Sequence, residues 1–134
     1  MTSRISRLNP PELHETPGYH HITIAESGRT AYLAGQCPLD AAGKLVGAGD
    51  YDAQAVQVAS NALAALKAID ASPEQVVRSV IYVVSPETLQ LGAVWRTLHT
   101  TPLAKAFTTA STLLGVAQLG FTDQLIELDL TVAL

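Results

Sequence analysis

The chain has 134 residues, 48% of them hydrophobic, and a formal net charge of -4. This length and apolar content suit one compact domain with a single core, so residues 1–134 are taken as one domain with an N-terminal extension over residues 1–16. Its eight Lys and Arg are scattered singly. Direct nucleic-acid binding is therefore not expected, because no basic stripe is present to neutralise phosphates.

Cysteine usage and hydropathy indicate the compartment. Cys37 is the single cysteine, which excludes an internal disulfide and a Cys-rich zinc site and favours a reducing compartment. Residues 1–11 lack the apolar segment of a secretory signal, and no run of about 18 apolar residues is present to span a bilayer. The sequence predicts a cytoplasmic protein with no membrane partner.

The first half of the chain predicts a hairpin, a loop and a helix. Residues 21–26 alternate apolar and polar positions, and a Ser-Gly-Arg turn leads into residues 30–35, which predicts a β-hairpin. Residues 38–50 hold three Gly and two Asp, which indicates a loop with a turn or short edge strand. A helix is predicted over residues 53–69, after the candidate N-caps Asp50 and Asp52.

The second half predicts one helix and three strands. Residues 72–75 carry the capping pattern of a single helical turn, and β-branched residues 76–84 predict a buried strand. A second helix begins near residue 85 and is stopped by Pro102. Its apolar face consists of Leu91, Val94, Trp95 and Leu98. Two final strands are predicted over residues 108–120 and 124–134, joined by a turn.

This β-β-α-β-α-β-β order predicts an α+β sandwich in which two helices cover one face of a sheet. Only 15% of the residues are charged, so the uncovered face is expected to meet other copies of the chain. In the last strand, Glu127 and Asp129 share the face opposite to the apolar residues. If that strand pairs with the preceding one, Ser111 or Thr112 lies close to Glu127. The alternative interpretation, to which we give equal weight, is that this face is only solvated, as Glu and Asp usually are.

Several segments together resemble the Rid family, which is also called YjgF or reactive intermediate deaminase and was formerly called endoribonuclease L-PSP. They are GYHHITIAESGRTAYLAGQCPLDAAGKL, Gln54 and Asn61 of the first helix, VVRSVIYVV, and STLLGVAQLGFTDQLIELDLTVA. The resemblance runs from about Tyr19 to the C-terminus. It implies a chorismate-mutase-like two-layer sandwich with a mixed sheet, two helices on one face, and assembly as a homotrimer.

The resemblance also implies clefts between subunits, where active members hydrolyse enamines or imines to keto acids with release of ammonia. In those members an Arg early in the penultimate strand binds the substrate carboxylate, a Glu in the last strand positions or activates water, and a Tyr lines the pocket. Glu127 and Tyr19 match that Glu and that Tyr. The candidate substrate-binding positions are Ser111, Thr112, His20 and Gly35, although a His at such a position is more commonly a satisfied surface residue. No cofactor or metal is implied.

One position departs from the family pattern. Active deaminases read Pro-Ala-Arg-Ser/Thr where residues 109–112 read Thr-Ala-Ser-Thr, so Ser111 stands at the Arg position. An Arg donates two parallel hydrogen bonds to a carboxylate and a Ser hydroxyl donates one at most. This loss is expected to cost a carboxylate ligand about 2 to 5 kcal/mol. Deamination of 2-aminoacrylate is therefore not expected, unless Arg96 or Lys105, which are more often solvated residues, replaces the missing Arg.

Three functions stay open. The first is an enamine or imine deaminase, or a related hydrolase, that acts on a small metabolite through Glu127, Tyr19 and a hydroxyl of Ser111 or Thr112. The second is a trimer that binds a small metabolite without chemistry. The third and weaker one is an endoribonuclease or translation inhibitor, against which the acidity of the chain argues.

The histidines and the cysteine are weaker candidates. His20 and His21 are adjacent and on a strand face opposite sides, and the spacing to His14 or His99 is not typical of a metal site. Cys37 is either an inert thiol or a reactive one, and the inert thiol is favoured because no cation adjoins it in the sequence.

Overall fold

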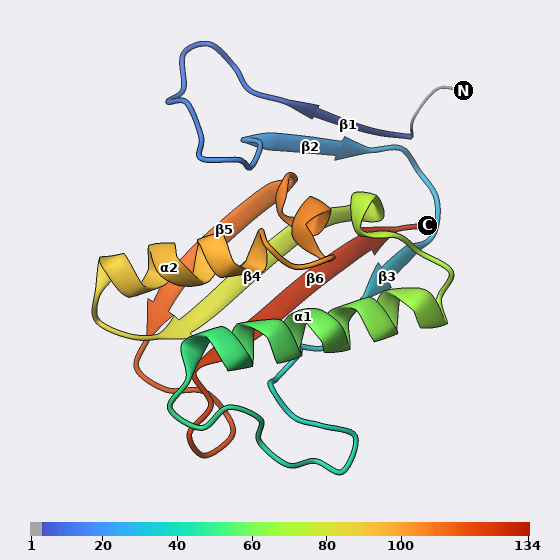
Figure 1. The fold of residues 1–134 in the computed structure, drawn as a ribbon. Helices are drawn as coiled ribbons and strands as arrows, with labels where there is room; N and C mark the ends of the chain where they lie inside the picture. Colours follow the sequence, from blue (N-terminus) through green and yellow to red (C-terminus); the bar gives the residue numbers. More distant parts are fainter. Residues whose placement is uncertain (1–3) are drawn as a thin grey trace.

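A computed structural model describes residues 4–134 and contains a four-stranded sheet with two helices on one face (Figure 1). The sheet has the order β3-β6-β4-β5 and consists of β3 (Thr30–Tyr32), β4 (Val76–Val84), β5 (Ala110–Val116) and β6 (Ile126–Ala133). The helices are α1 (Tyr51–Ala68) and α2 (Thr88–Leu98). β5 is parallel to β4, and the other pairs are antiparallel. The predicted two-layer α+β sandwich with a mixed sheet is confirmed.

Local sequence signals explain the helices and the central strand. Asp50 caps α1, because its carboxylate accepts a hydrogen bond from the Ala53 amide at 3.0 Å. The predicted single turn is present at Pro73–Gln75, and β4 has the predicted bounds. α2 ends at Leu98, before Pro102, so this proline is not the residue that stops the helix. No helix within residues 4–134 is both long and apolar enough to cross a membrane.

The predicted hairpin is wrong. β2 (Ile22–Ala25) pairs with β1 (Ile5–Leu8), a strand that the sequence pattern does not predict, and β3 pairs with β6. The turn between β2 and β3 therefore connects two sheets. The Arg4 guanidinium packs into this turn, where it donates to the Ser27 carbonyl, and a Cβ at Gly28 would lie 2.1 Å from Arg4 Nη2. The first three residues of the predicted extension lie outside the described residues.

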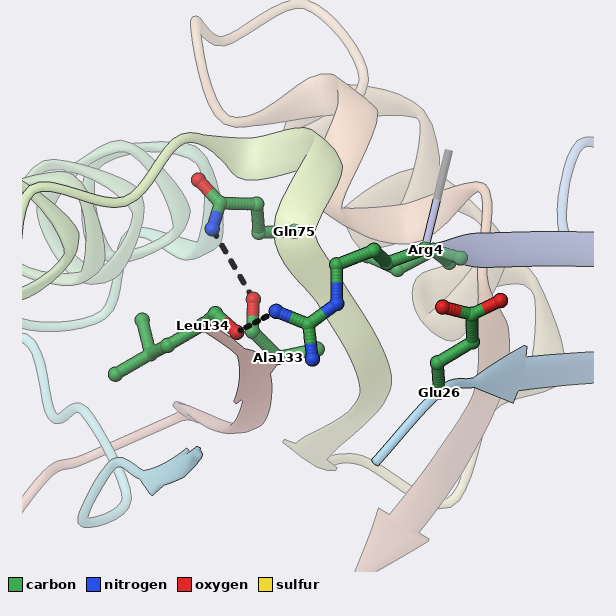
Figure 2. Close-up of a pocket in the computed structure, with 6 residues that line it drawn as sticks. Arg4, Glu26, Gln75, Ala133 and Leu134 are labelled. Atoms are coloured by element: carbon green, nitrogen blue, oxygen red, sulfur yellow. Dashed lines mark hydrogen bonds between the residues drawn. The ribbon is translucent and has the colours of Figure 1, made fainter. Parts of the chain in front are cut away.

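The β1–β2 ribbon lies across one end of the main sheet (Figure 1). Figure 2 shows one attachment, in which Arg4 Nη1 donates to the Leu134 carbonyl at 3.1 Å while Gln75 Nε2 donates to the Ala133 carbonyl at 3.1 Å. The hollow at this point has a volume of about 180 Å³. Ligand sites usually measure about 300 to 1,000 Å³, so we regard this hollow as structural.

The predicted alternation in β6 is confirmed, but the pairing of the last two strands is not. Ile126, Leu128, Leu130 and Val132 are at most 1% exposed, and Glu127 and Asp129 are partly exposed. β4 lies between β5 and β6, because this most apolar strand takes the centre, where both of its edges are hydrogen-bonded. Tyr82 therefore separates Leu114 from Glu127 in register. The proximity of Ser111 or Thr112 to Glu127 across a shared ladder does not occur.

Candidate functional site

A cavity of about 480 Å³ lies between α2 and β5. This volume falls within the usual range of small-molecule sites. Its walls include Tyr19, Trp95, Arg96, Ser111, Thr112 and Leu113. The structure thus brings together three of the predicted site residues, Tyr19, Ser111 and Thr112, at the edge of the sheet.

Tyr19 reaches the cavity from the connection between β1 and β2. Trp95 Nε1 donates to the Pro17 carbonyl at 3.1 Å, which attaches this connection to α2. The Tyr19 ring meets the Trp95 ring edge to face, with centroids 6.1 Å apart, and its hydroxyl lies 3.0 Å from His14 Nε2. Trp95, on the predicted apolar face of this helix, both packs against the core and lines the cavity.

The histidines near Tyr19 bind backbone carbonyls. The His20 ring is hydrogen-bonded through Nδ1 to the Thr108 carbonyl, and His20 is not among the residues that line the cavity. His21 Nε2 lies 2.8 Å from the His14 carbonyl oxygen. Within residues 4–134, no group of three or more His, Cys, Asp and Glu is placed to hold a metal ion. The histidines therefore act here as supports of the connection between β1 and β2.

Ser111, at the position of the family Arg, has its hydroxyl engaged within the fold. This hydroxyl donates to the Thr109 carbonyl at 3.0 Å and contacts the hydroxyl of the fully buried Ser79. Thr112, the next residue, projects from the opposite face of β5, where its Oγ1 accepts a hydrogen bond from Arg78 Nη2 at 2.9 Å. Of the two hydroxyls, the one on Thr112 has no acceptor for its proton within residues 4–134, but it lies on the helix-free face of the sheet.

The two cations considered as replacements for the family Arg have different surroundings. Lys105 Nζ lies 3.2 Å from Glu74 Oε1, and Lys105 does not line the cavity. Arg96 does line it, and within residues 4–134 its guanidinium makes no hydrogen bond or ion pair. Arg96 is therefore the available cation.

Glu127 lies away from the cavity, on the helix-free face of β6. Two strand spacings separate β6 from β5, or roughly 10 Å. Its neighbour is Gly35, which is held beside β6 because Gln36 and Leu128 exchange backbone hydrogen bonds of 2.7 and 3.0 Å. A Cβ at Gly35 would lie 2.1 Å from Glu127 Oε2. The absence of a side chain at Gly35 thus provides the space that the Glu127 carboxylate occupies.

Two donors hold one oxygen of this carboxylate. Gln124 Nε2 lies 3.1 Å from Glu127 Oε1 and Cys37 Sγ lies 3.3 Å from it. Within residues 4–134, Oε2 has no hydrogen-bond donor, so it is the oxygen open to a ligand or water. Sequence reasoning missed Gln124, because a polar residue just before a strand is usually expected to be solvated. In the structure its side chain turns inward, and the residue is 3% exposed.

The surroundings of Cys37 favour the inert thiol. Burial, followed by the hydrogen bond to Glu127 and the charge of Glu127, raises the pKa of Cys37 from 9.0 to about 11. Cys37 is nevertheless half-buried rather than fully enclosed. At pH 8 only about one thiol in a thousand is then ionised, and the thiolate is the reactive form.

Alkylation of Cys37 by iodoacetamide should therefore be slow and unusually alkaline in its pH dependence. Because the pKa is raised, we expect the rate to rise about tenfold per pH unit up to pH 10 without levelling. The rate is measured by mass spectrometry of samples quenched at successive times. The urea-unfolded protein is the control, and its alkylation rate should level near pH 9. A plateau near pH 9 in the folded protein would contradict the raised pKa.

Comparisons with known proteins agree with this architecture. A family model described as endoribonuclease L-PSP matches residues 12–134. The crystal structure of YyfB from Yersinia pestis, a protein of unknown function of the conserved Rid protein family, is 32% identical with a TM-score of 0.88 and covers 98% of this chain and 100% of that chain.

More distant structures share the fold alone. Yeast Mmf1 is 19% identical, with a TM-score of 0.64 and coverage of 96% of this chain and 98% of that chain. A member of the YjgF/YER057c/UK114 family from Mycobacterium tuberculosis is 20% identical, with a TM-score of 0.57 and coverage of 97% and 99%. No curated protein matches the chain.

Proposed function

Because the chain belongs to the endoribonuclease L-PSP family, also called the Rid family, we propose that it hydrolyses an enamine or imine of a small metabolite and releases ammonia. The geometry of Glu127 carries this proposal. One carboxylate oxygen is held by Gln124 and Cys37, and the other faces the bare backbone of Gly35. A carboxylate fixed in this way can take a proton from water as it attacks the imine carbon and return one to the leaving amine.

We further propose that the active form is a homotrimer with clefts between subunits. The helix-free face of the sheet is partly apolar, with Tyr32 80% exposed and Leu114 40% exposed. Glu127 lies on this face, and the cavity containing Tyr19 lies at the β5 edge. Packing of these faces against one another would cover the apolar side chains and place the carboxylate of one copy near the cavity of the next.

The proposal is tested by measuring ammonia release from imines that an amino-acid oxidase generates in situ. The wild-type protein should shorten the lifetime of at least one imine from a panel of aliphatic and aromatic amino acids. Oxidase alone and oxidase with heat-denatured protein are the controls. If no imine in the panel decays faster with the folded protein, it is not a deaminase of this kind.

The second candidate is a trimer that binds a small metabolite without chemistry. Two observations favour it: the Ser111 hydroxyl is engaged within the fold, and Glu127 lies apart from the cavity in a single chain. In that case a ligand raises the melting temperature and is recovered unchanged. Ribonuclease activity is the weakest candidate, because the net charge is -4. Tight, salt-sensitive binding of RNA would favour it.

A further inference from the structure

The side-chain amide of Gln124 has one orientation that its surroundings allow. Its Oε1 accepts a hydrogen bond from the Phe121 amide at 3.1 Å, and its Nε2 donates to the Ile126 carbonyl and to Glu127 Oε1, each at 3.1 Å. Rotation of the amide by half a turn would place its oxygen against two other oxygens and its nitrogen against an amide nitrogen. The nitrogen of Gln124 therefore faces Glu127, where it can only donate.

The segment that carries Gln124 is held on both sides by one residue of α1. Gln54 Nε2 donates to the Asp123 carbonyl at 3.0 Å, and Gln54 Oε1 accepts from the Leu125 amide at 2.7 Å. Both glutamines are buried, and a buried amide is costly to leave without partners. Gln124 is thus a rigid support for the carboxylate of Glu127, because its own backbone is fixed by α1.

Glu127 Oε1 receives a second hydrogen bond, from Cys37, whose Sγ lies 3.3 Å away. Burial raises the pKa of Cys37 to about 11, so the thiol keeps its proton at neutral pH and acts as the donor. A carboxylate oxygen has two lone-pair sites, and the two donors occupy those of Oε1. A proton that reaches Glu127 must then bind Oε2, the oxygen beside Gly35.

We infer that Gln124 is a positioning residue for the proposed imine hydrolysis, because it occupies Oε1 and thereby makes Oε2 the oxygen of Glu127 that accepts and returns the proton. The inference rests on the proposed function and adds the residue that orients its base. Gln124 acts through Glu127 and not on the substrate, since its side chain is buried. A base held in one orientation keeps its reacting oxygen aimed at one point.

The proton passes through Oε2 twice in this reaction. Water first gives a proton to Oε2 while its oxygen bonds to the imine carbon, and the C=N electron pair moves to the nitrogen, which takes that proton from Oε2. The amino alcohol then passes its hydroxyl proton through Oε2 to the nitrogen, the C–N bond breaks, and ammonia and a carbonyl product leave. Because both transfers use one oxygen, a fixed carboxylate serves both.

The substitution Gln124→Met tests this role, since Met keeps the length of the side chain and removes the donor. We expect the kcat of ammonia release to fall about 10- to 100-fold, as for a lost hydrogen bond to a charged group, with KM within about twofold of the wild type. The same substitution is then made together with Glu127→Gln, where no base remains to be oriented. There it should change the residual kcat by less than about twofold.

A role in folding alone would lower kcat by the same factor with and without the Glu127 carboxylate. That result, or an unchanged kcat in Gln124→Met, would overturn the inference. Gln75→Met is the matched control at the other end of β6. Gln75 Nε2 donates to the Ala133 carbonyl at 3.1 Å and its Oε1 accepts from the Ser72 amide at 3.0 Å, so this amide binds backbone at both ends. Its replacement should leave kcat within about twofold.

A magnetic resonance spectrum of the side-chain amides tests the contact without turnover. In isotope-labelled protein, the two Nε2 protons of Gln124 should exchange slowly with solvent, because both are bonded and buried. Glu127→Gln removes the charge from one acceptor, so it should move one of the two resonances and leave the proton that binds the Ile126 carbonyl nearly in place.

Rapid exchange of both protons, or no response of either to Glu127→Gln, would show that Gln124 does not bind Glu127 and would sink the inference. The spectrum also separates this failure from that of the proposed function. An active protein without the contact contradicts the positioning role alone. A protein that shows the contact but hydrolyses no imine contradicts the proposed reaction, and the positioning role with it.

Discussion

Replacement of Glu127 by Gln is expected to lower the kcat of ammonia release by about 100- to 10,000-fold, the usual contribution of a positioned acid or base. The amide has nearly the shape of the carboxylate, and its oxygen can still accept from Gln124 and Cys37. What it loses is the basic Oε2 that faces Gly35. Steady-state kinetics on the best imine substrate, with the melting temperature recorded in parallel, measure the effect.

Asp129→Asn is the matched control for this variant. Asp129 lies two residues further along β6, on the same face and with similar exposure, but has no cysteine or glutamine around its carboxylate. Its replacement should leave kcat within about twofold of the wild type, as expected for a group outside the reaction. If Glu127→Gln keeps full activity, or if both variants lose activity equally, Glu127 is not the proton-transferring group.

Replacement of Gln54 by Ala is expected to lower the free energy of unfolding by about 3 kcal/mol, since it removes three hydrogen bonds of a buried side chain at about 1 kcal/mol each. The Gln54 side chain is fully buried. Its Nε2 donates to the carbonyls of Gly47 and Asp123, each at 3.0 Å, and its Oε1 accepts from the Leu125 amide at 2.7 Å. One side chain thus joins α1 to the loop before it and to the segment that leads into β6. Urea unfolding measures the loss.

The same substitution one turn further along α1 provides the comparison. Gln57 is half-buried, and its Nε2 donates to Asn61 Oδ1 at 2.9 Å and to the Leu39 carbonyl at 3.4 Å. Gln57→Ala should cost about 1 kcal/mol, because the 2.9 Å bond contributes about that much and the 3.4 Å contact is long for a hydrogen bond. The helix propensity changes equally in both variants, so it cancels in the difference. A loss for Gln54→Ala no larger than that for Gln57→Ala would contradict the role of Gln54 in joining these loops.

The sequence by itself determined the elements whose signals are local. Helical spacing and an Asp cap predicted α1, a β-branched run predicted β4, and strict alternation predicted which face of β6 is buried. Such patterns work because hydrogen bonds within a helix join residues four apart, and because successive side chains in a strand point to opposite faces. The family was recognisable for a related reason, since its segments occur in the expected order along the chain.

Only the tertiary structure decided which strands pair and which side chains meet. Residues 21–35 carry the pattern of a hairpin, yet β2 pairs with β1 and β3 pairs with β6. Any strand edge offers the same backbone donors and acceptors, so the choice among edges depends on burial summed over the whole sheet.

The candidate site depended on the same non-local choices. Arg96 becomes the available cation of the cavity because α2 packs beside β5 and Gly92 leaves space. Glu127 gains one donor from Cys37, which is distant in the sequence, and one from Gln124, whose side chain is buried. No spacing along the chain encodes these contacts. They follow from packing, in which a side chain is placed by neighbours that the fold brings together from elsewhere in the chain.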